Sequence, residues 1–182
     1  PAEAFIAEAK PSFGFFSLGA YLALRGKYGL EPMGKASVSG GGGEQYYLVS
    51  KSATTLDECK GQTLATNHAS DAGFVNKVVF AGGVNLSDFE VVATRRPLQT
   101  LKKITRDEAV CALVDDAQIA ELSKVDGGDA VKPIWFSARF PSVVVVAFPG
   151  AADAAGFKAS LSKVCEGEGK TACDQAGIRD LE

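Results

Sequence analysis

Apolar positions near the start of the sequence follow patterns that predict a helix, a strand and a second helix. Apolar residues recur at helical spacing from Ala2 to Lys10, and Pro11 ends this pattern. The wholly apolar segment from Phe13 to Phe16 predicts a short strand. Ser17 can then cap a helix that ends near Gly29. This part of the chain is therefore predicted to contain a strand-turn-helix unit.

Strand-like and helix-like patterns alternate through the middle of the chain. Strands are predicted over residues 45–49, 63–66, 89–93 and 110–114, and helices from residue 55, through 74–79 and over 97–104. Such alternation is typical of βαβ units on a parallel sheet. The glycine run Gly40 to Gly43 precedes these elements and is predicted to be an exposed loop.

Beyond Pro133 the pattern changes to extended apolar segments. Strands are predicted over residues 134–136 and 143–148, a final helix over 151–164, and a loop with two cysteines after it. The apolar run from Val143 to Phe148 is far shorter than the ~20 residues that cross a bilayer. We therefore expect no membrane-spanning segment.

Composition limits the class of protein. The chain has 182 residues, of which 46% are hydrophobic and 23% charged, as in globular proteins. This length allows one large domain or two small lobes. Nineteen Lys and Arg residues stand against 22 Asp and Glu residues. Such a balance lacks the basic character of nucleic-acid binders, so no nucleic-acid partner is expected.

The four cysteines bear on the compartment. Cys165 and Cys173 enclose a polar, glycine-containing loop that can bend back, so a disulfide is predicted there, as in exported proteins. Cys59 and Cys111 lie among apolar neighbours and are either buried thiols or a second bridge. The cysteine spacings and the single histidine, His68, fit no zinc site. No metal or cofactor is expected.

Two segments place polar groups where a strand gives way to a helix. In open α/β sheets ligands bind there, beyond the carboxyl ends of the strands. The first segment runs from Ser17 to Tyr21, and the second from Asn67 to Asp71. Each is either an ordinary helix cap or a ligand contact. His68 can likewise be a ligand contact, an acid/base group or a cap.

Two charged pairs also follow strands. Asp115 and Asp116 either offer a carboxylate to a ligand or form a solvated turn, and only one of them can readily face a cleft. Arg95, with Arg96, either pairs with an anionic ligand or forms a charged loop surface. No GxSxG or HExxH motif occurs, and no cysteine has a base beside it, so the sequence favours binding over catalysis.

The order of these segments resembles the periplasmic solute-binding proteins of ABC transporters, in the phosphate, phosphite and phosphonate-binding family with the type II fold. The segment from Leu56 to Gly61, followed by a strand and a polar turn, is the most diagnostic. The matching segments are Phe15 to Leu24, Tyr46 to Ser52, Thr55 to Ala65, Asn67 to Phe74 and Ala109 to Asp116.

This resemblance implies an α/β fold with two lobes joined by two crossover strands. Residues 47–135 would form a complete second lobe, and residues 1–46 and 136–182 a partial first lobe without the family's initial strand-helix-strand. The implied ligand residues are Ser17 and Tyr21 from the partial lobe and Tyr47, Asn67, His68, Ala69, Ser70, Arg95 and Asp116 from the complete lobe.

The implied function is capture of a small polar, anionic ligand, phosphonate-like or phosphate-like, for delivery to an ABC transporter permease. A periplasmic or extracytoplasmic location and a preceding signal peptide are expected. The turn from His68 to Asp71 differs from the family's Ser-Thr-Ser-Gly type. Its added carboxylate repels a dianion unless it points away or pairs with Arg95 or Arg96. A ligand-sensing domain of a regulatory protein is the alternative, and an enzyme using His68 with Asp71 or Asp116 is the third.

Overall fold

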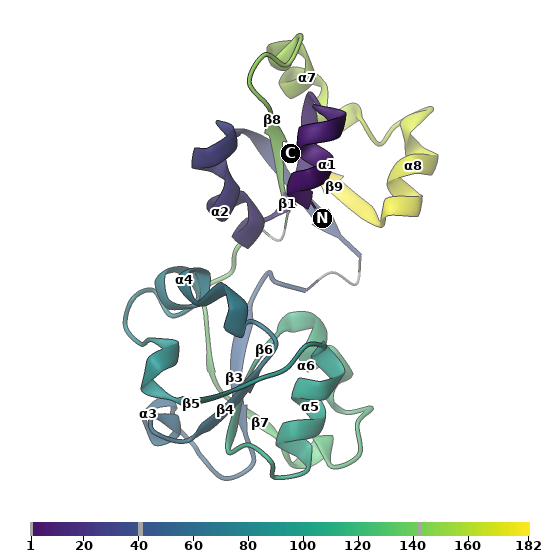
Figure 1. Cartoon of the computed structure of the whole chain (residues 1–182). Coiled ribbons are helices and arrows are strands. Elements are labelled where there is room, and N and C mark those ends of the chain that lie inside the picture. The colour runs from purple at the N-terminus through teal and green to yellow at the C-terminus, as the bar shows by residue number, and fades with distance from the viewer. Residues whose placement is uncertain (1, 40–41, 142) are drawn as a thin grey trace. The chain divides into compact units, whose positions relative to one another are not determined.

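The computed structural model describes residues 2–39, 42–141 and 143–182, which form two compact units (Figure 1). Unit 1 comprises Pro1–Gly41 and Pro141–Glu182, and unit 2 comprises Gly42–Phe140. The chain therefore passes twice between the units. The boundaries expected at residues 47 and 135 lie a few residues inside unit 2. Residues 40 and 41 of the expected glycine loop lie outside the described residues.

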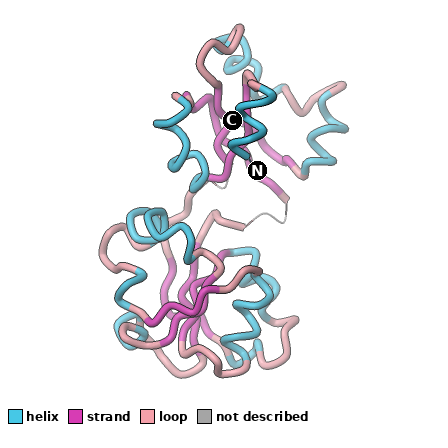
Figure 2. The backbone as a smooth tube through the Cα atoms, in the orientation of Figure 1, coloured by secondary structure: helices cyan, strands magenta, loops and turns pink. Residues whose placement is uncertain are grey.

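Unit 1 is built on a four-stranded antiparallel sheet (Figure 2). Its strand order is β1 (Phe13–Ser17), β8 (Val143–Ala147), β2 (Glu31–Val38) and β9 (Ile178–Leu181). Its helices are α1 (Ala2–Ala9), α2 (Leu18–Tyr28), α7 (Ala154–Ser160), a 3-10 turn (Leu161–Lys163) and α8 (Gly169–Ala176).

The central strand β8 is wholly apolar because both of its faces are covered. Val144 and Val146 pack with apolar side chains of α2, whereas Val145 and Ala147 pack with side chains of α7 and the turn after it. Successive residues of a strand point to opposite faces, which explains the alternation. The predicted run of valines thus forms the middle of unit 1.

Unit 2 is built on a five-stranded mixed sheet. Its strand order is β5 (Glu90–Ala93), β4 (Thr63–Thr66), β6 (Cys111–Asp115), β3 (Tyr46–Ser50) and β7 (Lys132–Phe136). β5, β4 and β6 are parallel, which confirms the predicted βαβ units, but β3 is antiparallel to both of its neighbours. β3 and β7 lie outside the alternating segment that predicted parallel strands, and they correspond to the two expected crossover strands.

Helices cover both faces of the unit 2 sheet (Figure 1). Leu101 and Ile104 of α5 and Leu122 of α6 pack against Ala65 and Ala112 on one face. Cys111 precedes Ala112 and so points to the other face, where it meets α3. The helices are α3 (Leu56–Cys59), α4 (Ala72–Phe74) with a π-helix after it (Val75–Val79), α5 (Pro97–Thr105), α6 (Asp116–Leu122) and 3-10 turns at Ala69–Asp71, Leu86–Asp88 and Gly128–Ala130.

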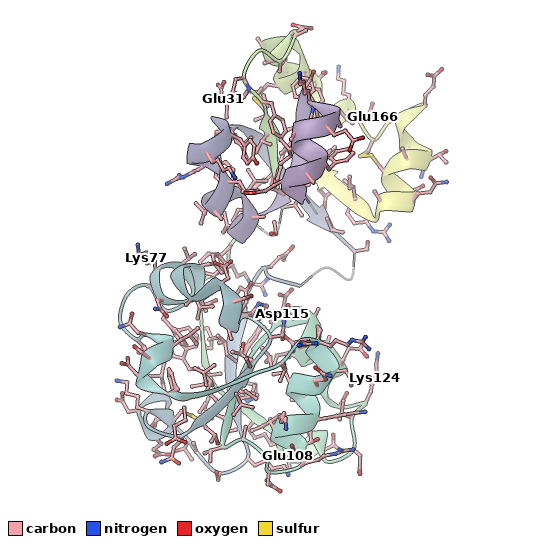
Figure 3. The ribbon with its side chains drawn as sticks, in the orientation of Figure 1. Glu31, Lys77, Glu108, Asp115, Lys124 and Glu166 are labelled. Atoms are coloured by element: carbon pink, nitrogen blue, oxygen red, sulfur yellow. A yellow bond between two sulfur atoms is a disulfide. The ribbon has the colours of Figure 1, made fainter. Side chains whose placement is uncertain are left out.

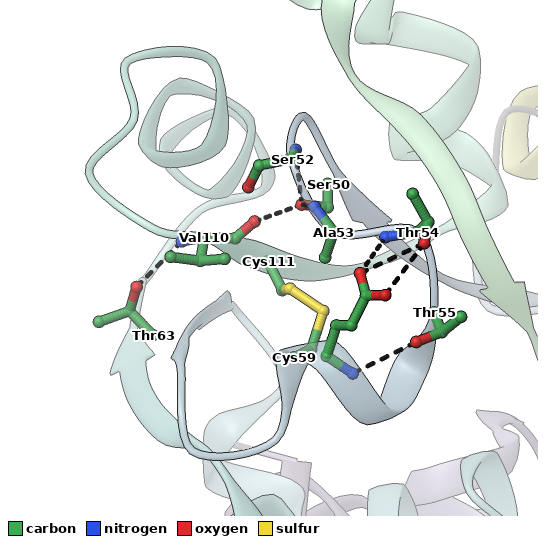
Figure 4. Close-up of a disulfide and its surroundings, with 10 residues drawn as sticks. Ser50, Ser52, Ala53, Thr54, Thr55, Cys59, Thr63, Val110 and Cys111 are labelled. Atoms are coloured by element: carbon green, nitrogen blue, oxygen red, sulfur yellow. Dashed lines mark hydrogen bonds between the residues drawn. A yellow bond between two sulfur atoms is a disulfide. The ribbon is translucent and has the colours of Figure 1, made fainter.

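Each unit contains one disulfide. The predicted bond between Cys165 and Cys173 is confirmed in unit 1. Cys59 of α3 and Cys111 of β6 form a second bridge, so the alternative of two buried thiols is wrong (Figure 4). Close by, the Ser50 hydroxyl donates to the Val110 carbonyl oxygen at 2.7 Å, which joins the end of β3 to the start of β6.

Several predicted elements need correction. The helix expected over 151–164 is only α7 with a 3-10 turn, because Asp153 caps the helix at Gly156 and thereby sets its start. The expected final loop contains α8 and β9. β2 and α6 were not predicted at all. None of the helices in the described part of the chain has the length and apolar character that a membrane crossing requires.

Candidate functional site

The carboxyl ends of β4 and β6 and the amino end of β3 bring polar residues to one edge of the unit 2 sheet. Asn67 and His68 follow β4, and Asp115 ends the neighbouring strand β6 (Figure 3). Tyr46 lies at the same edge because it pairs with Asp115 across the antiparallel strands. We call Tyr46, Asn67, His68, Asp115 and the nearby Gln118 the sheet-end site. Strand ends of this kind are where open α/β sheets bind ligands.

Asn67 and His68 are held by a chain of hydrogen bonds. The Asn67 amide donates to His68 Nε2 at 3.3 Å, and Thr100 Oγ1 donates to Asn67 Oδ1 at 3.2 Å. Thr94 Oγ1 lies 2.6 Å from Thr100 Oγ1, and the Thr94 backbone N–H donates to the carbonyl of Thr66. An amide nitrogen can only donate, so Nε2 of His68 must be an acceptor. This contact fits the neutral form of His68 with its proton on Nδ1.

The electrostatics of His68 agree with this assignment. Burial lowers the pKa of His68, although the carboxyl of Asp115, a hydrogen bond with Gln118 and the carboxyl of Asp71 oppose this shift. The rings of His68 and Tyr46 meet edge to face, with centroids 5.1 Å apart. Burial, followed by the charge of Asp115, raises the pKa of Tyr46. Both rings are consequently uncharged at neutral pH.

Asp115 combines a position in the site with a structural role. Its Oδ1 accepts from the Gln118 N–H at 2.9 Å, and the Gln118 side chain accepts from the Asp115 N–H, forming a capping box for α6. Burial raises the pKa of Asp115, opposed by the Gln118 backbone hydrogen bond and His68. A Cβ atom on Gly42 would lie 2.3 Å from Oδ2 of Asp115, so only glycine fits against this carboxyl.

Asp116 holds the loop that precedes β3. Its Oδ1 accepts backbone N–H groups of Gly43 at 2.8 Å, Glu44 at 3.1 Å and Gln45 at 3.3 Å. Its own N–H donates to the carbonyl of Gln45 at 2.9 Å. The structure thus gives the Asp116 carboxylate a loop-binding role, and a ligand contact by this residue stays a prediction.

The remaining predicted residues of unit 2 are dispersed. Tyr47 donates its hydroxyl to Gln45 Oε1 at 2.8 Å. Ala69 and the exposed Ser70 lie in the 3-10 turn after His68. Arg95 lines a hollow along α5 whose walls include neither Asn67 nor His68. Only Asn67, His68 and the turn after them are therefore gathered at the sheet-end site.

Ser17 and Tyr21 of unit 1 belong to the N-terminal turn of α2. Oγ of Ser17 accepts from the Ala20 N–H at 3.3 Å, as predicted for a cap. A hydroxyl that accepts in this way can still donate its own hydrogen to a ligand. The Arg25 guanidinium lies 5.9 Å from the centre of the Tyr21 ring. Their ligand-binding roles stay predictions.

Sequence reasoning missed Tyr46, Thr100 and Gln118. Gln118 had a detectable signal, because an Asp three residues before a Gln is a capping pattern for a helix. Tyr46 and Thr100 become recognisable only when the pairing of β3 with β6 and the packing of α5 are known. In the described ranges, no group of three or more His, Cys, Asp or Glu side chains could hold a metal ion.

Comparisons with known proteins identify the fold. The sequence matches no protein-family model and no curated protein. A protein from Xanthomonas citri solved with ATP bound matches 100% of this chain and 74% of its own, with a TM-score of 0.75 and 10% identity. A binding protein component of an ABC phosphonate transporter from Pseudomonas aeruginosa matches 98% of this chain and 65% of its own, with a TM-score of 0.63 and 14% identity.

A third similar structure is PhnD1 from Prochlorococcus marinus in complex with methylphosphonate. It matches 100% of this chain and 75% of its own, with a TM-score of 0.59 and 9% identity. These likenesses show the fold, which is the two-lobed type II fold of periplasmic binding proteins. At such low identity they do not show the family or the ligand.

Proposed function

We propose that the chain is a solute-binding protein that captures a small polar anion, of the phosphonate, phosphate or sulfonate class, for uptake by an ABC transporter. The observation that carries this proposal is the match of the whole chain to type II binding proteins. The named neighbours include a phosphonate transporter component and a periplasmic sulfonate-binding protein. The partner would be the transporter's permease.

In this proposal two segments of the chain supply hydrogen bonds for ligand binding. Unit 2 contributes Asn67, His68 and Ser70 from the turn after β4, and unit 1 contributes Ser17 and Tyr21 from the start of α2. Each segment follows a strand, where hydrogen-bond donors converge in α/β folds.

The charges of the sheet-end site favour a ligand with one negative charge over a dianion. His68 is neutral there, and Asp115 places a carboxyl beside it. A carboxylate repels a neighbouring anion, and the repulsion grows with the ligand's charge. An alkyl sulfonate therefore fits these residues better than a doubly ionised phosphonate.

The two disulfides support an extracytoplasmic location for this function. Disulfides persist in oxidising compartments such as the bacterial periplasm. Both pairs of cysteines are joined in the structure, and no free cysteine occurs among the described residues. These bonds support the proposal of a periplasmic or other extracytoplasmic location.

Calorimetry with a panel of anions tests the proposal. Methanesulfonate, methylphosphonate, phosphate, sulfate and amino acids are titrated into the oxidised chain and into the Asn67→Ala and His68→Ala variants. Ser162→Ala, at an exposed position of unit 1, is the control. We expect at least one anion to bind and both site variants to weaken it about tenfold or more. Binding that is unaffected by both substitutions would refute the assigned site.

A ligand-sensing domain of a regulatory protein is the second candidate. The glutamate-bound ligand-binding core of GluR0 from Nostoc punctiforme matches 96% of this chain and 76% of its own, with a TM-score of 0.54 and 13% identity. Gene neighbours separate the two, because a permease and an ATPase alongside favour transport. The enzyme alternative requires a turnover that the His68→Ala substitution abolishes.

A further inference from the structure

A hollow of about 520 Å³ runs along the exposed side of α5 in unit 2. The residues that line it and bear on its chemistry are Thr94, Arg95, Gln99, Lys102, Lys103 and Arg106. We call this feature the α5 hollow. Its volume falls within the range of small-molecule sites, about 300–1,000 Å³.

The α5 hollow is strongly basic within an acidic chain. Four of its residues are cations, whereas the chain as a whole has a net charge of −3. Its carboxylate, Glu108, pairs with Lys103. Across the described ranges Arg95, Lys102 and Arg106 form no ion pair. Four cations and one carboxylate line the hollow, which leaves an excess of three positive charges.

Helix stability does not account for this arrangement. Gln99, Lys102, Lys103 and Arg106 follow the helical spacing of one face, and like charges four residues apart repel each other. Cations near the end of a helix are stabilised by its dipole, but Arg95 precedes the start of α5, where a cation is disfavoured. A bound anion would relieve the repulsion between the like charges and would also offset the unfavourable position of Arg95.

The length of the α5 hollow favours a ligand with more than one anionic group. Its cations lie from before the first turn of α5 to just beyond its last turn, and nine helical residues span about 13 Å. A single phosphate is shorter than this backbone span, so a ligand with several anionic groups can contact more of the cations. At the first turn, Oε1 of Gln99 accepts from the Arg95 N–H, which leaves the Gln99 amide group able to donate.

We propose that the α5 hollow binds a compact polyanion that carries two or more phosphate groups. Guanidinium groups hold phosphate oxygens through paired hydrogen bonds, and lysines add point charges. A concave site with polar walls fits a small molecule better than the broad face of a bilayer. The hollow shares neither Asn67 nor His68 with the sheet-end site, so its role does not rest on the proposed transport function.

The test is a titration of inorganic tripolyphosphate and orthophosphate into the whole chain at low ionic strength, followed by calorimetry and amide NMR. The double variant Lys102→Gln/Arg106→Gln is compared with Lys158→Gln/Lys163→Gln. The latter pair is exposed, makes no ion pair in the described structure and removes the same charge from unit 1. Arg95→Gln is a second site variant, and Asn67→Ala monitors the sheet-end site.

We expect tripolyphosphate to bind more tightly than orthophosphate and to shift amides of α5. The double variant should weaken tripolyphosphate about tenfold or more, and Arg95→Gln should also weaken it, whereas the unit 1 control and Asn67→Ala should not. Equal losses in both double variants, or equal affinity for the two phosphates, would overturn the proposal. Binding to anionic lipid vesicles without binding of tripolyphosphate would also overturn it.

Discussion

The two disulfides should contribute unequally to stability. The bond between Cys59 and Cys111 joins residues 52 positions apart, and the bond between Cys165 and Cys173 joins residues 8 apart. When a disulfide restricts the unfolded chain, its contribution grows with the logarithm of the loop length. The expected losses of unfolding free energy are about 4.1 kcal/mol for the long loop and about 2.5 kcal/mol for the short loop at 25 °C.

Packing should increase this difference. Cys59 and Cys111 are fully buried, whereas Cys173 is nearly buried and Cys165 half-buried. Cysteine-to-alanine substitutions replace sulfur atoms by hydrogen, and they leave larger voids at the fully buried pair than at the partly exposed pair. Such voids lower the free energy of unfolding further. The difference of about 1.6 kcal/mol from loop entropy should therefore be a lower bound.

Urea unfolding of the two double variants, Cys59→Ala/Cys111→Ala and Cys165→Ala/Cys173→Ala, measures the difference. Trp135 is the single tryptophan and lies on β7 of unit 2, so its fluorescence reports the unit that contains the long loop. With a slope of about 2 kcal/mol/M, loss of the long-loop bond should lower the Trp135 midpoint by roughly 2 M. Circular dichroism follows both units.

The short-loop variant is the matched control, since it removes the same atoms from unit 1. It should change the circular dichroism transition and leave the Trp135 midpoint closer to that of the parent chain. A short-loop variant that is destabilised as much as the long-loop variant would refute the reasoning from loop length.

Three further predictions concern the site and its supports. His68 is the single histidine, so its proton NMR titration is unambiguous, and its midpoint should lie below the ~6.5 of an exposed histidine. Because the pKa of His68 is lowered in the folded state, the free energy of unfolding should fall as the pH drops from that value towards the folded pKa. This fall should disappear in His68→Gln. Asp116→Ala should lower the free energy of unfolding, measured by thermal unfolding, by about 1.5–3 kcal/mol, because three N–H groups lose their acceptor. Asp116→Asn should lower it less, and equal losses in the two variants would contradict the prediction. Ser17→Ala should destabilise unit 1 by about 1 kcal/mol, whereas Ser17→Asp should keep the helix cap. Ser17→Asp should nevertheless abolish anion binding in calorimetry. If this variant still binds the anion, Ser17 is not part of the ligand site.

Much of the fold could be predicted where local signals and packing agree. Ser17 and Gly29 mark the two ends of α2, and Gly29 adopts the left-handed conformation with φ 59° that ends a helix. The valine run of β8 is apolar throughout because both of its faces are covered. In these cases the local sequence preference and the tertiary packing favour the same conformation.

β2 could not be predicted, because its sequence opposes its conformation. It contains Pro32 and Gly34, which usually weaken strands. A Cβ atom at Gly34 would lie 2.3 Å from a methyl group of Leu161 and 2.4 Å from the carbonyl oxygen of Glu182. Gly34 therefore permits a close approach by residues far away in the sequence, and no local pattern contains that information.

The candidate site could be located in the sequence but not completed. The turn with Asn67 and His68 was recognisable because it follows a strand. Choosing between Asp115 and Asp116 required the structure, because Asp116 accepts N–H groups of the preceding loop while Asp115 acts on His68. Arg95 follows the carboxyl end of β5, as the sequence predicted, but it lines the α5 hollow, whose walls include neither Asn67 nor His68.

The most direct test of the central claim is an amide NMR titration of the oxidised chain with methanesulfonate and methylphosphonate. If the assigned residues of each unit bind anions, saturable shifts must appear at the amides from Ser17 to Ala20 in unit 1 and from Asn67 to Ser70 in unit 2. We expect both sets of shifts, and we expect His68→Ala to abolish the set from Asn67 to Ser70. Shifts confined to one unit, or the absence of saturable shifts with every anion of the panel, would contradict this expectation.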